Sequence, residues 1–400
     1  MTTYADRSRY LAGHICEWKR LLGYHAFGGG LSREGIVAPL GTGLAIHSGL
    51  EAVLKAWQDP AAHSNQPKFD YPNIIGPAVD DYRERIRQHG LMNMNDQQVQ
   101  EQLAIAEALP HAYARVCEEW FTDEFEILDV EAEEMFAVGS VNWMARSDFV
   151  TKSKKTGLFA VHDFKSAAGW YPDSATAEYT DSLQLMLNAE AASRRLGQPV
   201  TQYYIHILVK GTKRSQSPLI MPWYQAANPP FQIEDFATRF KYVGNDGKNH
   251  YLPKSYTRTN IWDHMEISKW VGELCPLDTL KESIIVIGPY GVHQPKINKF
   301  LRGLERNEQR WSARMDHLQD TWSGGVGSTS SDLAAEWTHW AEPAFQSDLD
   351  HMFPRTYNCH QYGSACEFYS LCHEKPGWEH PIENKAFTYR IPHHPTEVKK

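Results

Sequence analysis

The 400-residue chain lacks any apolar run near the roughly 20 residues that a membrane-spanning helix needs. Its N-terminal sequence, MTTYADRSRYLAGHICEW, lacks the uninterrupted apolar segment of a secretion signal. These two absences lead us to expect a cytoplasmic protein with no membrane partner. The helicase motif G-x-x-x-x-G-K-[ST] is also missing, so ATP-driven unwinding would need another chain.

An excess of basic residues is missing too. The 49 acidic residues outnumber 40 lysines and arginines and give a net charge of −9. A protein that coats nucleic acid is normally strongly basic, so this class is disfavoured. An enzyme that contacts DNA over a small area is not excluded, because carboxylates that bind a metal ion also add negative charge. A hydrophobic content of 42% indicates a folded globular protein.

Helical and strand patterns alternate along the first half of the chain. Apolar residues at helical spacing predict helices over residues 7–24, 40–57, 97–121 and 175–196. Segments rich in β-branched and aromatic residues predict strands over residues 126–138, 141–150, 157–165 and 201–210. Residues 59–77, rich in Pro, Asn and Asp, are expected to form a loop. Further helices are expected at 257–274, 294–322 and 331–345. The order of these elements predicts an α/β core.

Two of the predicted strands, VNWMARSDFV and GLFAVHDFK, flank a Lys-Lys-Thr-Gly turn. In a simple antiparallel hairpin, Val150 pairs with Val161 and Asp148 lies opposite Asp163, with Cβ atoms about 5 Å apart. Lys165 shares their face because side chains alternate along a strand. Two such close carboxylates repel unless a cation lies between them. A divalent metal with a lysine beside it is what phosphodiester hydrolysis needs. A solvated edge or a surface ion pair is the alternative interpretation, and one bulge would change the register.

Five residues resemble, in order and approximate spacing, the motifs of RecB-like PD-(D/E)XK nucleases. They are His47 in GLAIH, then Asp148, then Asp163 and Lys165 in DFK, then Gln184 in SLQLMLNA. The resemblance implies a restriction-endonuclease-like α/β core, with a central mixed sheet flanked by helices. It implies that His47, Asp148 and Asp163 bind Mg²⁺ or Mn²⁺ and that Lys165 assists the attacking water. It also implies that Gln184 lines the active site. The catalytic residues implied by the resemblance are therefore Asp148, Asp163, Lys165 and Gln184.

Two positions bear on how closely the chain follows that pattern. Glu131 matches an acidic position on the first strand of the family, although Glu133 or a plain polar strand face fits as well. The family often has a Tyr four residues after the Gln, where this chain has Asn188. An asparagine cannot stack on a base, so the resemblance implies no stacking role there.

Three cysteines, Cys359, Cys366 and Cys372, lie within fourteen residues near the C-terminus. In a reducing compartment, such crowding indicates metal or cluster ligation rather than disulfides. Four ligands are required, and Cys16 is the best candidate for the fourth. One N-terminal and three C-terminal cysteines are typical of the iron–sulfur branch of this family, so the resemblance implies a 4Fe–4S cluster. Many members have two residues rather than six between the first pair. This departure leaves zinc open, with a neighbouring histidine as a substitute ligand.

The four expected segments follow from these motifs. They are an N-terminal helix with a cluster cysteine (1–34), the nuclease core (35–212), an accessory, mainly helical region (213–350) and a C-terminal cluster segment (351–400). The resemblance implies a Mg²⁺- or Mn²⁺-dependent DNA exonuclease of recombination, replication or DNA processing, in the host cytoplasm if a phage encodes it. DNA is the expected partner, with a helicase, a single-strand annealing protein or another recombination protein. Two alternatives stay open: a catalytically weak DNA-binding or assembly subunit, and a CRISPR-adaptation nuclease.

Overall fold

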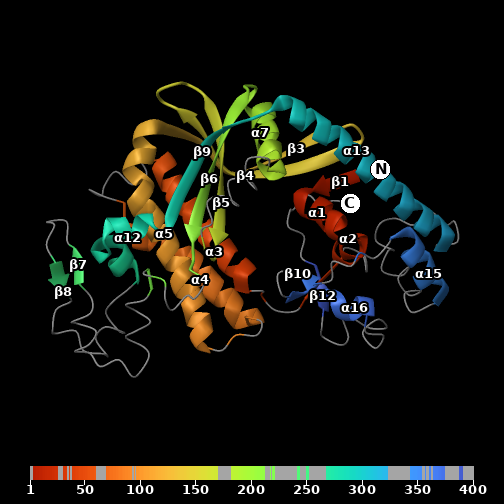
Figure 1. Cartoon of the computed structure of the whole chain (residues 1–400), viewed down its shortest axis with the longest axis horizontal. Coiled ribbons are helices and arrows are strands. Elements are labelled where there is room, and N and C mark those ends of the chain that lie inside the picture. The colour runs from red at the N-terminus through yellow and green to blue at the C-terminus, as the bar shows by residue number, and fades with distance from the viewer. Residues whose placement is uncertain are drawn as a thin grey trace. The chain divides into compact units, whose positions relative to one another are not determined.

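The chain divides into two compact units in its computed structural model (Figure 1). The first comprises Met1–Glu34, Glu134–Ala145 and Gln294–Lys400, and the second comprises Gly35–Glu133 and Arg146–His293. The residues that the structure describes are 3–25, 30–33, 36, 38–59, 69–91, 94, 96–169, 182–211, 217, 219–220, 241–243, 249–251, 267–322, 343–353, 356, 360–361, 364–373 and 387–390.

The second unit is built on a mixed β-sheet. The C-terminal half of β4 (Val141–Ser153) pairs antiparallel with β5 (Phe159–Ala167), and β3 (Phe125–Val138) also pairs with β4. β5 pairs in parallel with β6 (Val200–Val209), which pairs antiparallel with β9 (Ile284–Gly291). Parallel neighbours need a crossover connection, and α7 (Leu183–Leu196) lies in the chain between β5 and β6. The expected α/β class is confirmed.

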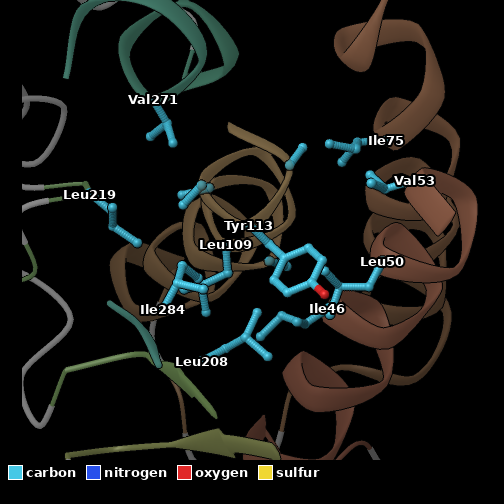
Figure 2. Packing of buried hydrophobic residues seen from close by; sticks show 14 of the residues in the cluster. Ile46, Leu50, Val53, Ile75, Leu109, Tyr113, Leu208, Leu219, Val271 and Ile284 are labelled. Atoms are coloured by element: carbon cyan, nitrogen blue, oxygen red, sulfur yellow. The ribbon is translucent and has the colours of Figure 1, made fainter. Parts of the chain in front are cut away.

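Helices cover both faces of this sheet, because side chains alternate along each strand. Leu208 points into the largest apolar cluster, to which α3, α4 and α5 contribute on one face (Figure 2). Phe164 belongs to the same cluster. Val161 and Ile205 point to the other face and pack against Leu185 of α7. Each such fully buried side chain stabilises the fold by about 1.5–3 kcal/mol. The bounds of the three helices are Ala38–Gln58 (α3), Tyr71–His89 (α4) and Asp96–Glu124 (α5).

Two elements differ from the sequence-based expectations. The loop expected over 59–77 is wrong in its second half, because α4 begins at Tyr71. Asp70 caps this helix by accepting the backbone N–H of Asn73, and a proline occupies its first turn, where no N–H is needed. The second difference is β9, which lies within the region 213–350 that was expected to be mainly helical. Its isoleucine-rich half pairs with β6, so this part of the region completes the core sheet.

The remaining described elements of the second unit are short. They are β7 (Lys241–Val243), β8 (Asn249–Tyr251), α11 (Ile267–Lys269), a π-helix (Trp270–Leu274) and α12 (Leu277–Lys281). Parts of three expected helices lie outside the described residues. They are most of the helix expected over 257–274, residues 175–181 of the helix expected over 175–196, and most of the helix expected over 331–345.

The first unit gathers helices from both ends of the chain around a second apolar cluster that contains Trp18, Trp311 and Phe368. The single helix expected over 7–24 is broken at Cys16, whose backbone is extended (φ −162°, ψ 125°). The helix expected over 294–322 is confirmed as α13. The helices are α1 (Arg7–Ile15), α2 (Glu17–Tyr24), α13 (Gln294–Trp322), α15 (Pro343–Met352) and α16 (Tyr369–His373).

Short strands complete the first unit. β1 (Thr3–Asp6) pairs in parallel with Val141–Met144 of β4, and β2 (Leu31–Arg33) pairs with β12 (Phe387–Tyr389). β10 (His360–Gln361) pairs with β11 (Ser364–Ala365). None of the helices in the described part of the chain is both long enough and apolar enough to cross a membrane.

Candidate metal centre

The predicted register of the β4–β5 hairpin is confirmed. Val150 pairs with Val161, and the ladder ends one pair before Asp148 would lie opposite Asp163. At that point the backbone N–H of Phe164 donates to Asp148 Oδ2 at 2.5 Å. The two aspartates therefore lie where the paired strands separate, and one of them is fixed by the backbone of the other strand.

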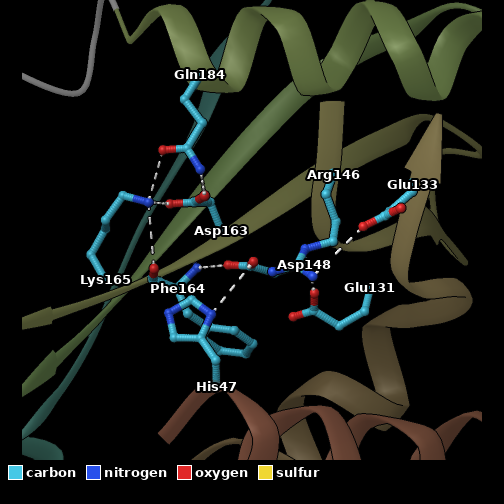
Figure 3. Close-up of polar contacts among 9 residues, drawn as sticks. All are labelled: His47, Glu131, Glu133, Arg146, Asp148, Asp163, Phe164, Lys165 and Gln184. Carbon is cyan, nitrogen blue, oxygen red and sulfur yellow. Dashed lines mark hydrogen bonds and ion pairs between the residues drawn. The ribbon is translucent and has the colours of Figure 1, made fainter. Parts of the chain in front are cut away.

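One ligand atom from each of His47, Glu131 and Asp148 lies within 4.8 Å of the other two. His47 extends from α3, and its Nδ1 is 3.6 Å from Asp148 Oδ1 (Figure 3). Among the described residues, no other three His, Cys, Asp or Glu side chains meet this distance. These three residues form a candidate metal centre that contains two of the three expected ligands.

Glu131 reaches the candidate metal centre through an unusual backbone conformation. Its φ is 51°, and no other non-glycine residue in the described ranges has a positive φ. The left-handed region costs a side chain with a Cβ about 1–2 kcal/mol, and such strain is found most often at functional sites. From the sequence, Glu131 and Glu133 fitted the acidic position on the first strand equally well, and no residue near them indicates a left-handed conformation. The structure places Glu131, and not Glu133, in the group of three.

Asp163, Lys165 and Gln184 form a closed ring of polar contacts beside the candidate metal centre. Lys165 Nζ forms an ion pair with Asp163 Oδ2 and donates to Gln184 Oε1 at 3.1 Å. Gln184 Nε2 donates to Asp163 Oδ1 at 2.9 Å. Asp163, the third expected ligand, is thus held by Lys165 and Gln184. Asn188, one turn further along α7, is only 3% exposed and offers no surface for a base.

The region carries more negative than positive charge. Four carboxylates, from Glu131, Glu133, Asp148 and Asp163, face the two fixed cations Arg146 and Lys165 (Figure 3). The excess is two negative charges when all four carboxylates are ionised and His47 is neutral. A single divalent cation would balance them.

Burial and neighbouring charges perturb the pKa values of these groups in different directions. Burial, reinforced by the charge of Asp148, raises the pKa of Glu131 to about 7. Burial would also raise the pKa of Asp148, but His47 and Lys165 outweigh it and the pKa is lowered. Burial and the charge of Asp148 outweigh Lys165 at Asp163, whose pKa is raised. Burial alone would lower the pKa of His47, but the two aspartates raise it. Metal ligation requires these groups to be deprotonated, so a bound cation would stabilise that form.

Three of the four predicted cluster cysteines lie in the described part of the first unit. Cys16, Cys366 and Cys372 all pack against its apolar cluster. Burial raises the pKa of the Cys366 thiol, and the nearby Cys16 adds to the shift. Cys359 lies outside the described residues. The fold thus brings three cysteines from opposite ends of the chain to one apolar cluster. They are Cys16, the extended residue between α1 and α2, together with Cys366 and Cys372.

The comparisons with known proteins give no family. The sequence matches no protein-family model, and no curated protein matches it. The function is therefore argued from the side chains of the candidate metal centre and from the cysteines.

Proposed function

We propose that this chain is a Mg²⁺- or Mn²⁺-dependent DNA nuclease of the PD-(D/E)XK class, most simply an exonuclease. The observation that carries the proposal is the group of His47, Glu131 and Asp148 beside the ring of Asp163, Lys165 and Gln184. The confirmed hairpin register supports it, because that register puts the two aspartates at one end of the paired strands.

The donor atoms fit a divalent metal ion that prefers oxygen. Carboxylate oxygens suit Mg²⁺ and Mn²⁺, and the imidazole of His47 shifts the preference toward Mn²⁺. Two carboxylates, from Glu131 and Asp148, would share the ion with that imidazole. When bound, such an ion polarises a phosphate and lowers the pKa of a coordinated water.

The protein's own groups then position the reactants. The ammonium group of Lys165 carries three donors. Two face Asp163 and Gln184, and the third, 3.5 Å from the carbonyl oxygen of Phe164, would turn to a water or a phosphate oxygen. Gln184 and Asp163 fix that ammonium group from two sides, so it is held without waiting for substrate. The N–H of Phe164 fixes Asp148 in the same way. Such prior positioning is where catalysis of phosphoryl transfer is mainly gained.

We also propose that the cysteines bind a 4Fe–4S cluster in the first unit. Three of the four expected ligands pack on one apolar cluster, and the fourth, Cys359, lies outside the described residues. Cluster sulfurs bind different iron atoms, so they need not approach as closely as ligands of one ion. The cluster would link position 16 to positions 359–372 and so stabilise the first unit.

The nuclease assignment is tested with end-labelled linear DNA and closed circular DNA, with and without Mn²⁺. We expect the wild type to degrade linear DNA only with the metal, and Lys165→Ala to lose at least about 100-fold in rate. Lys152→Ala is the matched control, since this lysine lies on the same hairpin and contacts the ring of Phe159. Cleavage of circles would show an endonuclease. DNA binding by the wild type without cleavage would favour the DNA-binding or assembly subunit.

A further inference from the structure

Arg146 lies between two glutamates of the neighbouring strand, and one of them belongs to the candidate metal centre. Its Nε is 3.1 Å from Glu131 Oε2, and its Nη1 is 3.8 Å from Glu133 Oε1 (Figure 3). Residues two apart on a strand share a face, which lets one guanidinium reach both carboxylates. The Arg146 side chain is 46% exposed, so part of the guanidinium remains open to solvent.

A cation at the candidate metal centre and Arg146 would compete for the same carboxylate. Glu131 supplies a ligand atom to the group of three and also accepts the close contact from Arg146. Two positive charges a few ångströms apart repel, and the repulsion is largest where the surroundings are partly buried. Glu131 is only 16% exposed, so solvent screens this competition poorly. Glu133, which is more exposed, offers the arginine a second position.

We propose that Arg146 neutralises Glu131 while no cation is bound, and that cation binding displaces it toward Glu133 and a phosphate of the DNA. The inference rests on the proposed nuclease function. A phosphate is the expected new partner because a guanidinium is planar and binds phosphate through two parallel hydrogen bonds. Arg146 thereby couples metal binding to substrate binding: the displaced guanidinium is free for the DNA only when the metal is in place.

Three variants separate this exchange from a general charge effect. Arg146→Gln should tighten Mn²⁺ binding about fivefold, since a partly exposed ion pair contributes about that factor. Glu133→Gln should weaken Mn²⁺ binding, because Arg146 then has only Glu131. In the double variant, Glu133→Gln should have little further effect if Glu133 acts through Arg146. A simple loss of negative charge would instead weaken binding equally in both backgrounds.

Isothermal titration of the full chain with MnCl₂ measures these affinities. Arg195→Gln is the matched control, because Arg195 pairs with Asp129 of the same strand β3. It should leave Mn²⁺ binding within about twofold of the wild type. DNA binding is measured by fluorescence anisotropy with Mn²⁺, in a Lys165→Ala background that prevents cleavage. There, Arg146→Gln should weaken binding and reduce the salt dependence by about one phosphate contact.

The outcomes distinguish this inference from the proposed function. Wild-type protein that binds no Mn²⁺ overturns the candidate metal centre and the exchange together. Wild-type protein that binds Mn²⁺ and cuts DNA, while Arg146→Gln binds the metal no more tightly, overturns the exchange alone. Additive effects in the double variant also overturn it. Tighter metal binding, weaker DNA binding and a silent Glu133→Gln in the double variant together support it.

Discussion

Two arginine–carboxylate pairs join α2 to α13 in the first unit and differ mainly in burial. Arg20 donates to both oxygens of Glu308 at 2.7 and 2.6 Å, and the two side chains are 4% and 0% exposed. Arg314 donates to both oxygens of Glu17 at 2.6 and 3.0 Å, and these two side chains are 32% and 25% exposed. The same chemistry in two surroundings gives a prediction with an internal control.

Glu308→Gln keeps the shape of the side chain but leaves the charge of Arg20 uncompensated inside the protein. Removing one partner of a buried pair costs about 3–5 kcal/mol. A partly exposed pair contributes at most about 1 kcal/mol. We therefore expect the free energy of unfolding to fall by about 3–5 kcal/mol in Glu308→Gln, and by less than about 1 kcal/mol in Glu17→Gln.

Urea unfolding followed by circular dichroism measures both losses, from the midpoint and the slope of each transition. A double variant, Arg20→Met with Glu308→Leu, provides a further check, because replacing both charges with apolar groups should recover most of the stability. Equal losses in the two single variants would refute the reasoning. So would a double variant as unstable as Glu308→Gln, since the cost would then not come from an unpaired charge.

Three further predictions concern pH, backbone conformation and the cysteines. Burial lowers the pKa of His206 to about 3 and that of His111 to about 4, whereas an unfolded chain has about 6.5. Below pH 6.5 the unfolded state binds more protons at these two histidines, so together they should lower the free energy of unfolding by about 3–4 kcal/mol from pH 7 to pH 5. The raised pKa of Glu131 acts in the opposite direction, so the measurement is made on Glu131→Gln, in which equal urea midpoints at both pH values would contradict this. Gly30→Ala should lower the free energy of unfolding, measured with urea, by more than about 1 kcal/mol, because φ is 97° and a Cβ would overlap a carbonyl oxygen of α2. Cys366→Ser should lose its iron and brown colour and become insoluble, whereas Cys117→Ser should stay soluble and keep both the iron and the colour. A colourless wild type with stoichiometric zinc would count against the 4Fe–4S cluster.

The sequence predicted most of the core sheet because its strands carry clear local patterns. The strands expected at 126–138, 141–150, 157–165 and 201–210 match β3 to β6 within a few residues. Two elements were missed for local reasons. The prolines and asparagine around α4 suggested a loop, although Asp70 with a proline two residues later is also typical of a helix start. The short apolar run of β9 stood alone between turn residues, and its partner β6 lies more than seventy positions earlier.

The candidate metal centre was predictable where strand geometry alone decides it. The hairpin register put Asp148 and Asp163 just beyond the last pair of the ladder, and alternation put Lys165 on the same face as Asp163. The choice of Glu131 over Glu133 was not predictable, because it depends on one left-handed residue inside a strand. The exchange at Arg146 was equally hidden, since an arginine two positions before an aspartate carries no signal until both glutamates are placed beside it.

Phe164 connects Asp148 of the candidate metal centre to Lys165 and so fixes the spacing between them. Its ring lies in the core, with ring centroids 5.1 Å from Tyr113 and 5.2 Å from Phe149. Its backbone N–H holds Asp148, and its carbonyl oxygen lies 3.5 Å from Lys165 Nζ. Alternation along β5 turns the ring toward the core and the charged neighbours toward α7. One peptide segment, fixed by packing on one face, therefore sets the distance between the group that would hold the metal and the lysine that would orient the water. Because that face is close-packed and yields little, the two groups keep their spacing before any ligand arrives.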